Sequence, residues 1–219
     1  MSKLSEVLRQ LTQMGQKCVY CDKEISVDKI ICEACEVCEK KLLNKDGFCN
    51  GILYTYRYDG VARDLIRRFK YGDSPRYSMF LAQKMADFLQ DYELAVDLIT
   101  FVPIHKNRMR QRGFDQSELI ATHLALLLNI ECKSLLIRKR DTKPQYQLNA
   151  QQRIQNIKGA FALSKDYSIH LKDQNILLID DIYTTGITVS ECMNELKKAG
   201  TNVMVYTFAK EMISEDKCL

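Results

Sequence analysis

The stretch Ile176–Thr188 reads ILLIDDIYTTGIT, and it decides the fold that the sequence predicts. Four apolar residues predict a buried β-strand, two aspartates follow them, and a Thr-rich turn then leads into a predicted helix that ends at Gly200. Such a turn collects backbone N–H groups and the positive end of the helix dipole, so it is suited to binding an anion. The segment therefore predicts an α/β domain with a parallel sheet and an anion site at its edge.

The residue types in this turn predict which anion it binds. The hydroxyl side chains, which can donate hydrogen bonds to phosphate oxygens, are those of Thr184, Thr185 and Thr188. Gly186 allows the backbone to approach a ligand closely. Asp180 and Asp181 follow the strand where open α/β sheets bind ligands, and their carboxylates would accept hydrogen bonds from a sugar diol. Together these residues predict a site for ribose 5-phosphate.

Length and composition place the chain among ordinary folded proteins. It has 219 residues, of which 46% are hydrophobic and 27% charged, and these values exclude a disordered or collagen-like chain. No apolar run approaches the roughly 18 residues that a membrane span needs. The first residues mix charged and apolar side chains without the apolar stretch of a signal peptide, so we expect a cytoplasmic location.

The remaining segments predict two parts of the chain. Strands are expected at residues 53–58, 98–102, 135–137 and 203–208, and helices at 61–69, at 78–89 and after a Ser117 cap. Residues 1–51 hold six of the nine cysteines and few large apolar residues, so they could not form a core without a metal. We therefore expect a zinc-binding module with an N-terminal helix over residues 1–51 and a larger α/β domain over residues 52–219.

The cysteine spacing predicts a structural zinc site. Two C-x2-C pairs separated by ten residues provide the four thiols of Cys18, Cys21, Cys32 and Cys35. This arrangement suits tetrahedral Zn²⁺, and in a reducing compartment it favours a metal over disulfides. Cys38 forms a further C-x2-C pair with Cys35, and Cys49 could also reach the site. Either of them could replace one of the four ligands.

A basic block lies between Pro103 and Arg153, where ten Lys or Arg accompany four Asp or Glu and give a net charge of +6. Such a block calls for phosphates or a nucleic-acid backbone, although a solvated surface is the plainer alternative. The basic residues nearest to the predicted strand at 98–102 are His105, Lys106 and Arg108. Those that we expect to meet nucleic acid are Arg110, Arg112, Arg138, Lys139, Arg140 and Lys143.

Three motifs carry a resemblance to known families. The segment Ile176–Thr188 resembles the phosphoribosyl diphosphate (PRPP) motif of type I phosphoribosyltransferases. The segment RGFDQ at 112–116 is similar to an RGFNQ signature of the ComF competence family, with Asp115 in place of the usual Asn. The segment 138–163 resembles that family's R-x-x-x-T-K-P-Q stretch and the KGAF strand that follows it.

The resemblance implies a fold and a set of site residues. The fold is a type I phosphoribosyltransferase-like parallel sheet flanked by helices, with residues 138–163 forming a flexible loop. Asp180 and Asp181 would be the catalytic pair, Mg²⁺ would accompany PRPP, and His105, Lys106 and Arg108 would form the diphosphate loop. The PRPP-binding set is Asp180, Asp181, Tyr183, Thr184, Thr185, Gly186, Ile187 and Thr188.

The resemblance also implies a role, for which the residues leave alternatives open. The implied role is cytosolic handling of single-stranded DNA during natural transformation, with partners in the competence machinery such as a ComF-type helicase. An active phosphoribosyltransferase is the alternative, because its chemistry needs no protein nucleophile, but no acceptor site is evident in the sequence. A regulator that senses PRPP has no helix-turn-helix signature to support it.

Tyrosine, histidine and cysteine residues outside the motifs are expected mostly to pack in the core. Tyr54, Tyr56 and Tyr58 alternate along a predicted strand, where they would stack nucleic-acid bases or, as the pattern favours, pack as an aromatic face. His123 and Cys192 lie on the apolar stripes of their predicted helices, and we expect both in the core.

Overall fold

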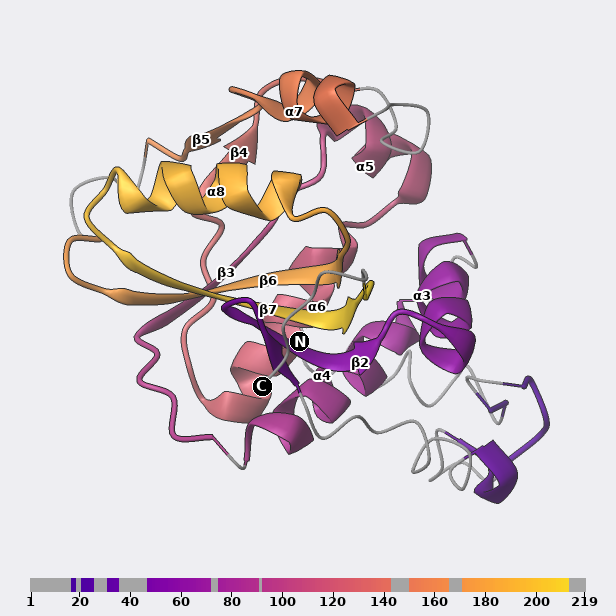
Figure 1. Cartoon of the computed structure of the whole chain (residues 1–219). Helices are drawn as coiled ribbons and strands as arrows, with labels where there is room; N and C mark the ends of the chain where they lie inside the picture. Colours follow the sequence, from indigo (N-terminus) through magenta and orange to yellow (C-terminus); the bar gives the residue numbers. More distant parts are fainter. Residues whose placement is uncertain are drawn as a thin grey trace, which may run out of the picture.

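A five-stranded sheet forms the centre of the computed structural model (Figure 1). The structure describes residues 17–18, 21–25, 31–35, 47–71, 75–90, 92–142, 150–165 and 171–212. The expected N-terminal helix, Cys38 and Lys143 lie outside these residues. None of the helices in the described ranges combines the length and hydropathy that a membrane span requires.

The strand order is β1-β2-β7-β6-β3, and its last four strands are parallel. The strands are β1 (Phe48–Cys49), β2 (Ile52–Arg57), β3 (Leu98–Phe101), β6 (Asn175–Tyr183) and β7 (Asn202–Lys210). The edge strand β1 pairs antiparallel with β2 through Asn50 and Gly51, whose φ angles of 53° and 78° are those of a tight hairpin turn. The predicted α/β fold with a parallel sheet is therefore confirmed.

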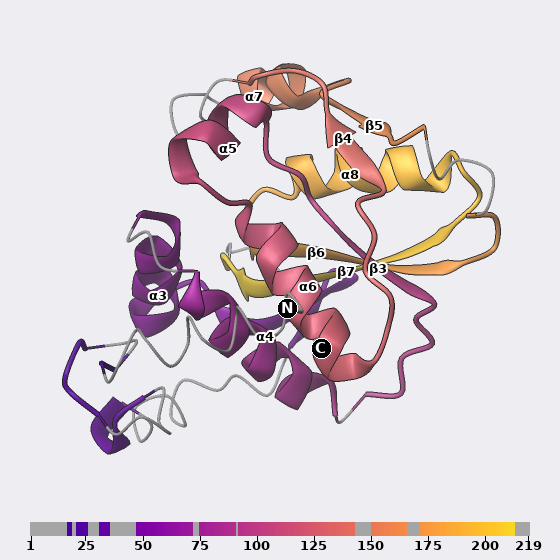
Figure 2. The ribbon, with the colours of Figure 1, turned by 180° about the vertical axis from the view of Figure 1, so that it is seen from behind.

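Helices cover both faces of the sheet (Figures 1 and 2). One face packs against α3 (Gly60–Tyr71), α4 (Arg76–Leu89) and α6 (Gln116–Leu128). The other packs against α8 (Ile187–Lys197), α7 (Ala150–Ile157) and a small antiparallel sheet of β4 (Leu136–Arg138) and β5 (Phe161–Leu163). A short helix, α5 (Lys106–Arg112), follows β3.

The apolar run of β6 explains why both faces are covered. Leu177 and Ile179 belong to the core on the α4 and α6 side, whereas Ile176 and Leu178 belong to the core on the α8 side. Successive side chains of a strand point to opposite faces, so an unbroken apolar run needs a layer on each side. Burial of such a side chain contributes about 1.5–3 kcal/mol, and the central strand thereby holds two layers together.

Most predicted elements are confirmed, and β6 is longer than expected. The expected strands at 53–58, 98–102 and 203–208 correspond to β2, β3 and β7, and the helices at 61–69 and 78–89 to α3 and α4. Because β7 continues to Lys210, the parallel pairing of β6 with β7 extends as far as Tyr183 and Lys210. Asp180 and Asp181 therefore lie within the end of the strand rather than in the turn after it.

Two expectations about the basic segments are wrong. The residues after β3 form α5 rather than an open loop. The described parts of 138–163 contain β4, α7 and β5, so they are not a flexible loop. The predicted strand at 135–137 is confirmed as β4, which pairs antiparallel with β5 in a second, smaller sheet.

The prediction that the tyrosines of β2, His123 and Cys192 pack in the core is confirmed. Tyr54 and Tyr56 are buried, and the ring of Tyr56 lies 5.0 Å from that of Phe208. Tyr58 packs partly buried against the same core. His123 on α6 and Cys192 on α8 are both buried, and burial lowers the pKa of His123.

Asp115, rather than the predicted Ser117, caps α6 and ties it to the segment after β3. One carboxylate oxygen accepts hydrogen bonds from the backbone N–H groups of Ser117 and Glu118, at 3.0 and 3.2 Å. The other accepts from the N–H of Ile104 at 2.8 Å. Three backbone donors thus depend on one buried carboxylate, whose burial raises its pKa to about 6.

We predict that Asp115→Ala lowers the free energy of unfolding at pH 7.5 by about 2 kcal/mol, because the three N–H groups lose their acceptor. Asp115→Asn should lose less, since an amide oxygen still accepts from the helix. Urea denaturation measures both effects. Glu131→Ala, which removes an acid from an exposed ion pair with Lys133, is the control and should change the value by less than about 0.5 kcal/mol. Equal stability of Asp115→Ala and wild type would contradict the role of the cap.

Candidate functional site

A cavity of about 640 Å³ opens at the end of β6, in the size range of small-molecule sites. Its walls come from the turn between β6 and α8, the segment after β3, the start of α6, the end of α3 and β4. All eight residues of the predicted PRPP set line it, namely Asp180, Asp181, Tyr183, Thr184, Thr185, Gly186, Ile187 and Thr188. The structure thus places these residues around one cavity, at the sheet edge where the sequence predicted a site.

The turn after β6 presents backbone donors to the cavity. Gly186 is the N-cap residue of α8 and has a φ of 72°, and a side chain at this position would collide with the ring of Tyr183. As a glycine it supplies no side-chain oxygen to the first N–H groups of α8. These groups and the helix dipole face the same place, which gives the turn the properties of an anion site.

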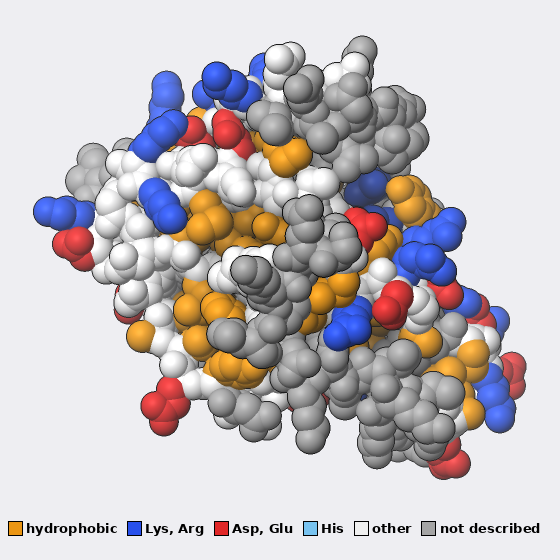
Figure 3. All heavy atoms as spheres, in the orientation of Figure 1, with side chains coloured by type: hydrophobic (Ala, Val, Ile, Leu, Met, Phe, Trp, Pro, Cys, Tyr) orange, Lys and Arg blue, Asp and Glu red, His pale blue; other side chains and the backbone are white. Residues whose placement is uncertain are grey.

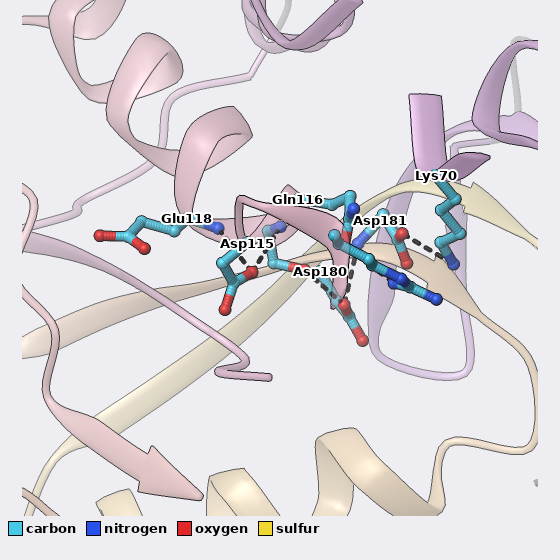
Figure 4. Close-up of polar contacts among 8 residues, drawn as sticks. Lys70, Asp115, Gln116, Glu118, Asp180 and Asp181 are labelled. Atoms are coloured by element: carbon cyan, nitrogen blue, oxygen red, sulfur yellow. Dashed lines mark hydrogen bonds and ion pairs between the residues drawn. The ribbon is translucent and has the colours of Figure 1, made fainter. Parts of the chain in front are cut away.

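The two acids of β6 have separate partners (Figure 4). Asp180 Oδ1 accepts hydrogen bonds from the Ser117 hydroxyl and from the backbone N–H of Asp181, both at 2.9 Å. Lys70 Nζ on α3 lies 2.8 Å from Asp181 Oδ2, and both side chains are mostly buried. Burial and then the charge of Asp181 raise the pKa of Asp180 to about 7. Asp180 is therefore close to its titration point at neutral pH, whereas Asp181 has a cation beside it.

Two partners of the acids, Lys70 and the hydroxyl of Ser117, are not predicted by the motifs. Lys70 lies in the last turn of α3, more than a hundred residues before Asp181, and only the tertiary fold brings the two together. Ser117 follows the RGFDQ segment, and its position there predicts a helix cap, whereas in the structure its hydroxyl donates to Asp180. The motif spacing alone carried no signal for either contact.

Three of the predicted basic residues line the cavity, and two of them converge on Thr142. Arg108 donates to the backbone oxygen of Thr142 at 3.5 Å, and Arg138 donates to its hydroxyl. The Arg138 guanidinium also lies 5.1 Å from the centre of the Phe161 ring. Burial, and then the charge of Arg108, lower the pKa of Arg138 to about 10. Two neighbouring guanidiniums whose charges disfavour each other provide a position for an anion.

The other predicted basic residues lie elsewhere. His105 is buried, and its Nδ1 caps α5 by accepting from the N–H of Asn107 at 3.3 Å, so it has a structural contact outside the cavity lining. Lys106, Arg110 and Lys139 are exposed outside the lining. Arg140 donates to the backbone oxygens of Asn156 and Lys158. Of the predicted diphosphate loop, the cavity includes Arg108 alone.

The four predicted zinc ligands form a compact cluster. The sulfur atoms of Cys18, Cys21, Cys32 and Cys35 all lie within 4.8 Å of one another, and those of Cys21 and Cys32 are 3.7 Å apart. A tetrahedron with Zn–S bonds of about 2.3 Å has edges of about 3.8 Å. A hydrogen bond from the Cys35 backbone lowers the pKa of Cys32 to about 7, whereas burial and the neighbouring thiols raise the pKa of Cys35. The cluster can therefore hold a metal ion such as zinc.

Cys49 is not available as an alternative ligand. It is disulfide-bonded, and a sulfur in a disulfide has no thiolate to offer a metal. The expectation that the cysteines of this region avoid disulfides is therefore wrong for Cys49. Asp22, which lies in the chain between Cys21 and Cys32, pairs with Arg68 of α3 at 2.5 Å and so links the cluster to that helix.

Solved structures of phosphoribosyltransferases are among those to which this chain is similar. An adenine phosphoribosyltransferase has 16% identity and a TM-score of 0.40, over 68% of this chain and 75% of that one. Glutamine PRPP amidotransferase from B. subtilis has 20% identity and a TM-score of 0.41, over 62% of this chain and 26% of that one. At these scores the fold class rests on the sheet order and layers described above.

Sequence relatives are more informative, although no family model matches the chain. Competence protein F of Haemophilus influenzae is 29% identical over 67% of this chain and 66% of its own length. Competence protein ComFC of Bacillus subtilis is 27% identical over 89% of this chain and 77% of its own. The DNA utilization protein YhgH of Escherichia coli is 34% identical over 48% of this chain and 44% of its own length, so the chain matches less than half of that protein. Competence protein F, ComFC and YhgH are thus homologues of this chain, and the resemblance to the ComF family that its motifs predict is confirmed.

Proposed function

We propose that the cavity binds PRPP with Mg²⁺, and that the chain handles single-stranded DNA in the cytoplasm during natural transformation. The observation that carries the first part is the composition of one cavity. The same space is surrounded by a glycine turn at the start of a helix, by two acids, and by two arginines that both donate to Thr142. The names of the homologues, which refer to competence and DNA utilization, support the second part.

The 5-phosphate, the ribose diol and the diphosphate of PRPP each match a different part of the cavity lining. The backbone N–H groups and hydroxyls of Thr184–Thr188 suit the 5-phosphate, since they offer donors at a positive helix end. Asp180 and Asp181 accept from the ribose diol, which makes them the pair closest to the reacting sugar. Arg108 and Arg138 suit the diphosphate, because their guanidiniums converge at Thr142.

The residues present fit Mg²⁺ as a companion of the diphosphate. Mg²⁺ prefers oxygen ligands and is commonly held by one or two carboxylates together with substrate phosphates. Direct coordination by Asp181 would compete with the ammonium group of Lys70 at 2.8 Å. We therefore expect the ion to enter on the diphosphate oxygens, with Lys70 keeping Asp181 oriented toward the sugar.

We predict that Asp180→Ala with Asp181→Ala weakens PRPP binding at least about 30-fold in calorimetric titration, because two or more hydrogen bonds to the diol are lost. Omitting Mg²⁺ should also weaken binding in wild type. The double variant Asp64→Ala with Glu131→Ala removes two exposed acids outside the cavity lining and should bind as wild type does. Unchanged affinity after loss of both aspartates would reject the site.

We also propose that the cysteine cluster holds one structural Zn²⁺. Protein purified without a chelator should contain about one equivalent by plasma mass spectrometry. Cys32→Ser with Cys35→Ser should lose it, because two of the four thiolates are gone. Cys132→Ser, which changes a half-buried thiol outside the cluster, should retain full zinc content. A zinc content well below one equivalent in wild type would refute the assignment.

Binding of single-stranded DNA is assigned to exposed basic residues around the cavity. Lys106, Arg110, Lys139 and Arg140 are exposed, and they lie on α5 and just after β4. Figure 3 shows Lys and Arg side chains gathered along the edge of the molecule between α5 and α3. Charges that track a phosphate backbone without reading bases give binding that is independent of sequence and dependent on salt.

We measure the association constant K for a labelled single-stranded oligonucleotide over a salt series. The slope of log K against log salt concentration should be about −3, since each of four phosphate contacts contributes about −0.7. Lys106→Ala with Arg110→Ala should flatten the slope by about 1.4 units. Lys197→Ala with Lys198→Ala on and after α8 makes the same charge change away from these residues and should leave the slope unaltered. A flat salt dependence in wild type would argue against DNA binding.

An active phosphoribosyltransferase is the second candidate function. The cavity favours it because its lining extends beyond the PRPP set to Tyr71, Arg112 and Gln116, where an acceptor would lie beside the sugar. In such a transfer the diphosphate leaves C1 with the bonding electron pair, and the acceptor supplies the pair for the new bond and releases a proton. Release of pyrophosphate from PRPP, with and without single-stranded DNA, separates this enzyme from a binding protein.

A further inference from the structure

Lys210 is a buried lysine that the proposed function does not use. It is the last residue of β7, and only 1% of it is exposed. Lysines are almost never buried so completely unless other groups stabilise the charge, because the ammonium group loses its hydration. Lys210 does not belong to the cavity lining, so any effect that it has on a ligand must pass through a neighbouring residue.

The neighbour that connects Lys210 to the cavity is Tyr183, the last residue of β6. The two residues are paired in the register of β6 with β7, so their side chains lie on the same face of the sheet. Lys210 Nζ lies 5.6 Å from the centre of the Tyr183 ring, within the range of a cation–π contact. The next residue, Glu211, donates its backbone N–H to the Tyr183 oxygen at 2.8 Å. The end of β7 therefore holds both the ring and the backbone of Tyr183.

The Tyr183 ring lies against the turn that leads from β6 into α8. It lines the cavity and packs partly buried against the core on the α8 side. A Cβ atom at Gly186 would collide with the hydroxyl and ring carbons of Tyr183, so the ring touches the backbone of the turn. Gly186 is the N-cap residue of α8, and its carbonyl oxygen accepts from the N–H of Ser190 at 2.8 Å. A displaced ring would therefore disturb the start of α8.

We propose that Lys210 is a positioning residue for this turn. Its buried ammonium group holds the Tyr183 ring against Gly186 and thereby keeps the first N–H groups of α8 directed into the cavity. Burial favours this role, because a cation–π contact is stronger when it is shielded from water. The proposal rests on the proposed function, since it adds a residue to the site assigned to the 5-phosphate. Donors that are already in position bind an anion more tightly, because they need no ordering when it arrives.

The first test measures hydrogen exchange of the ligand-free protein by mass spectrometry. Lys210→Met removes the charge from a side chain of similar length, and Lys210→Arg keeps a cation. Exchange over residues 190–192, in the first hydrogen-bonded turn of α8, should be on the order of fivefold faster in Lys210→Met. Lys210→Arg should exchange there as wild type does. Exchange over α4 should be the same in all three proteins, and equal acceleration in both segments would indicate a general loss of stability and contradict a local role.

The second test is calorimetric titration with PRPP. Lys210→Met should bind on the order of fivefold more weakly than wild type, and Lys210→Arg should recover most of the loss. Because Lys210 acts through the ring, Lys210→Met should have no further effect in a Tyr183→Leu background. The control Lys197→Met removes an exposed lysine in the last turn of α8 and should match wild type in both tests.

The two tests distinguish the positioning role from the proposed function. Unchanged exchange at the start of α8 in Lys210→Met overturns the proposal. Equal PRPP affinity of Lys210→Met and a wild-type protein that binds PRPP also overturns it. If wild type binds no PRPP, the proposed function fails, and hydrogen exchange alone decides on Lys210: faster local exchange supports the positioning role and unchanged exchange rejects it.

Discussion

Two carboxylates stand on consecutive residues at the end of a buried strand, and much of the site depends on how their charge is accommodated. Burial, and after it the like charge of the adjacent Asp181, raises the pKa of Asp180 to about 7. Ser117 of α6 and Lys70 of α3 each supply a partner to one acid. These contacts lie at the start of α6 and at the end of α3, so Gln116 and Tyr71 line the cavity next to them.

The walls of the cavity offer three kinds of chemical group. The turn before α8 offers backbone donors at a helix end, the acids of β6 offer acceptors, and the two arginines at Thr142 offer positive charge. A ligand that carries a phosphate, a diol and a second anionic group would satisfy all three. This match of a single ligand to several walls is why we favour PRPP over a simple phosphate.

The sequence was sufficient where local pattern determines structure. The apolar run of β6, the turn after it and the spacing of four cysteines each correspond to a feature of the fold, and the eight motif residues lie around one cavity. It was insufficient where tertiary contacts decide. Nothing local marks Lys70 as the partner of Asp181, and the net charge of a block does not tell which arginines enter a cavity and which remain exposed. The disulfide at Cys49 likewise depends on which sulfurs the fold brings together.

The proposal that the cavity is built for a phosphoribosyl group can be tested by a crystal structure of the protein with PRPP and Mg²⁺. The 5-phosphate should lie on the backbone N–H groups of Thr184–Thr188, and the ribose hydroxyls should contact Asp180 and Asp181. The diphosphate should then face Arg108 and Arg138. A ligand bound outside the cavity, or one whose ribose leaves both aspartates without contact, would contradict it.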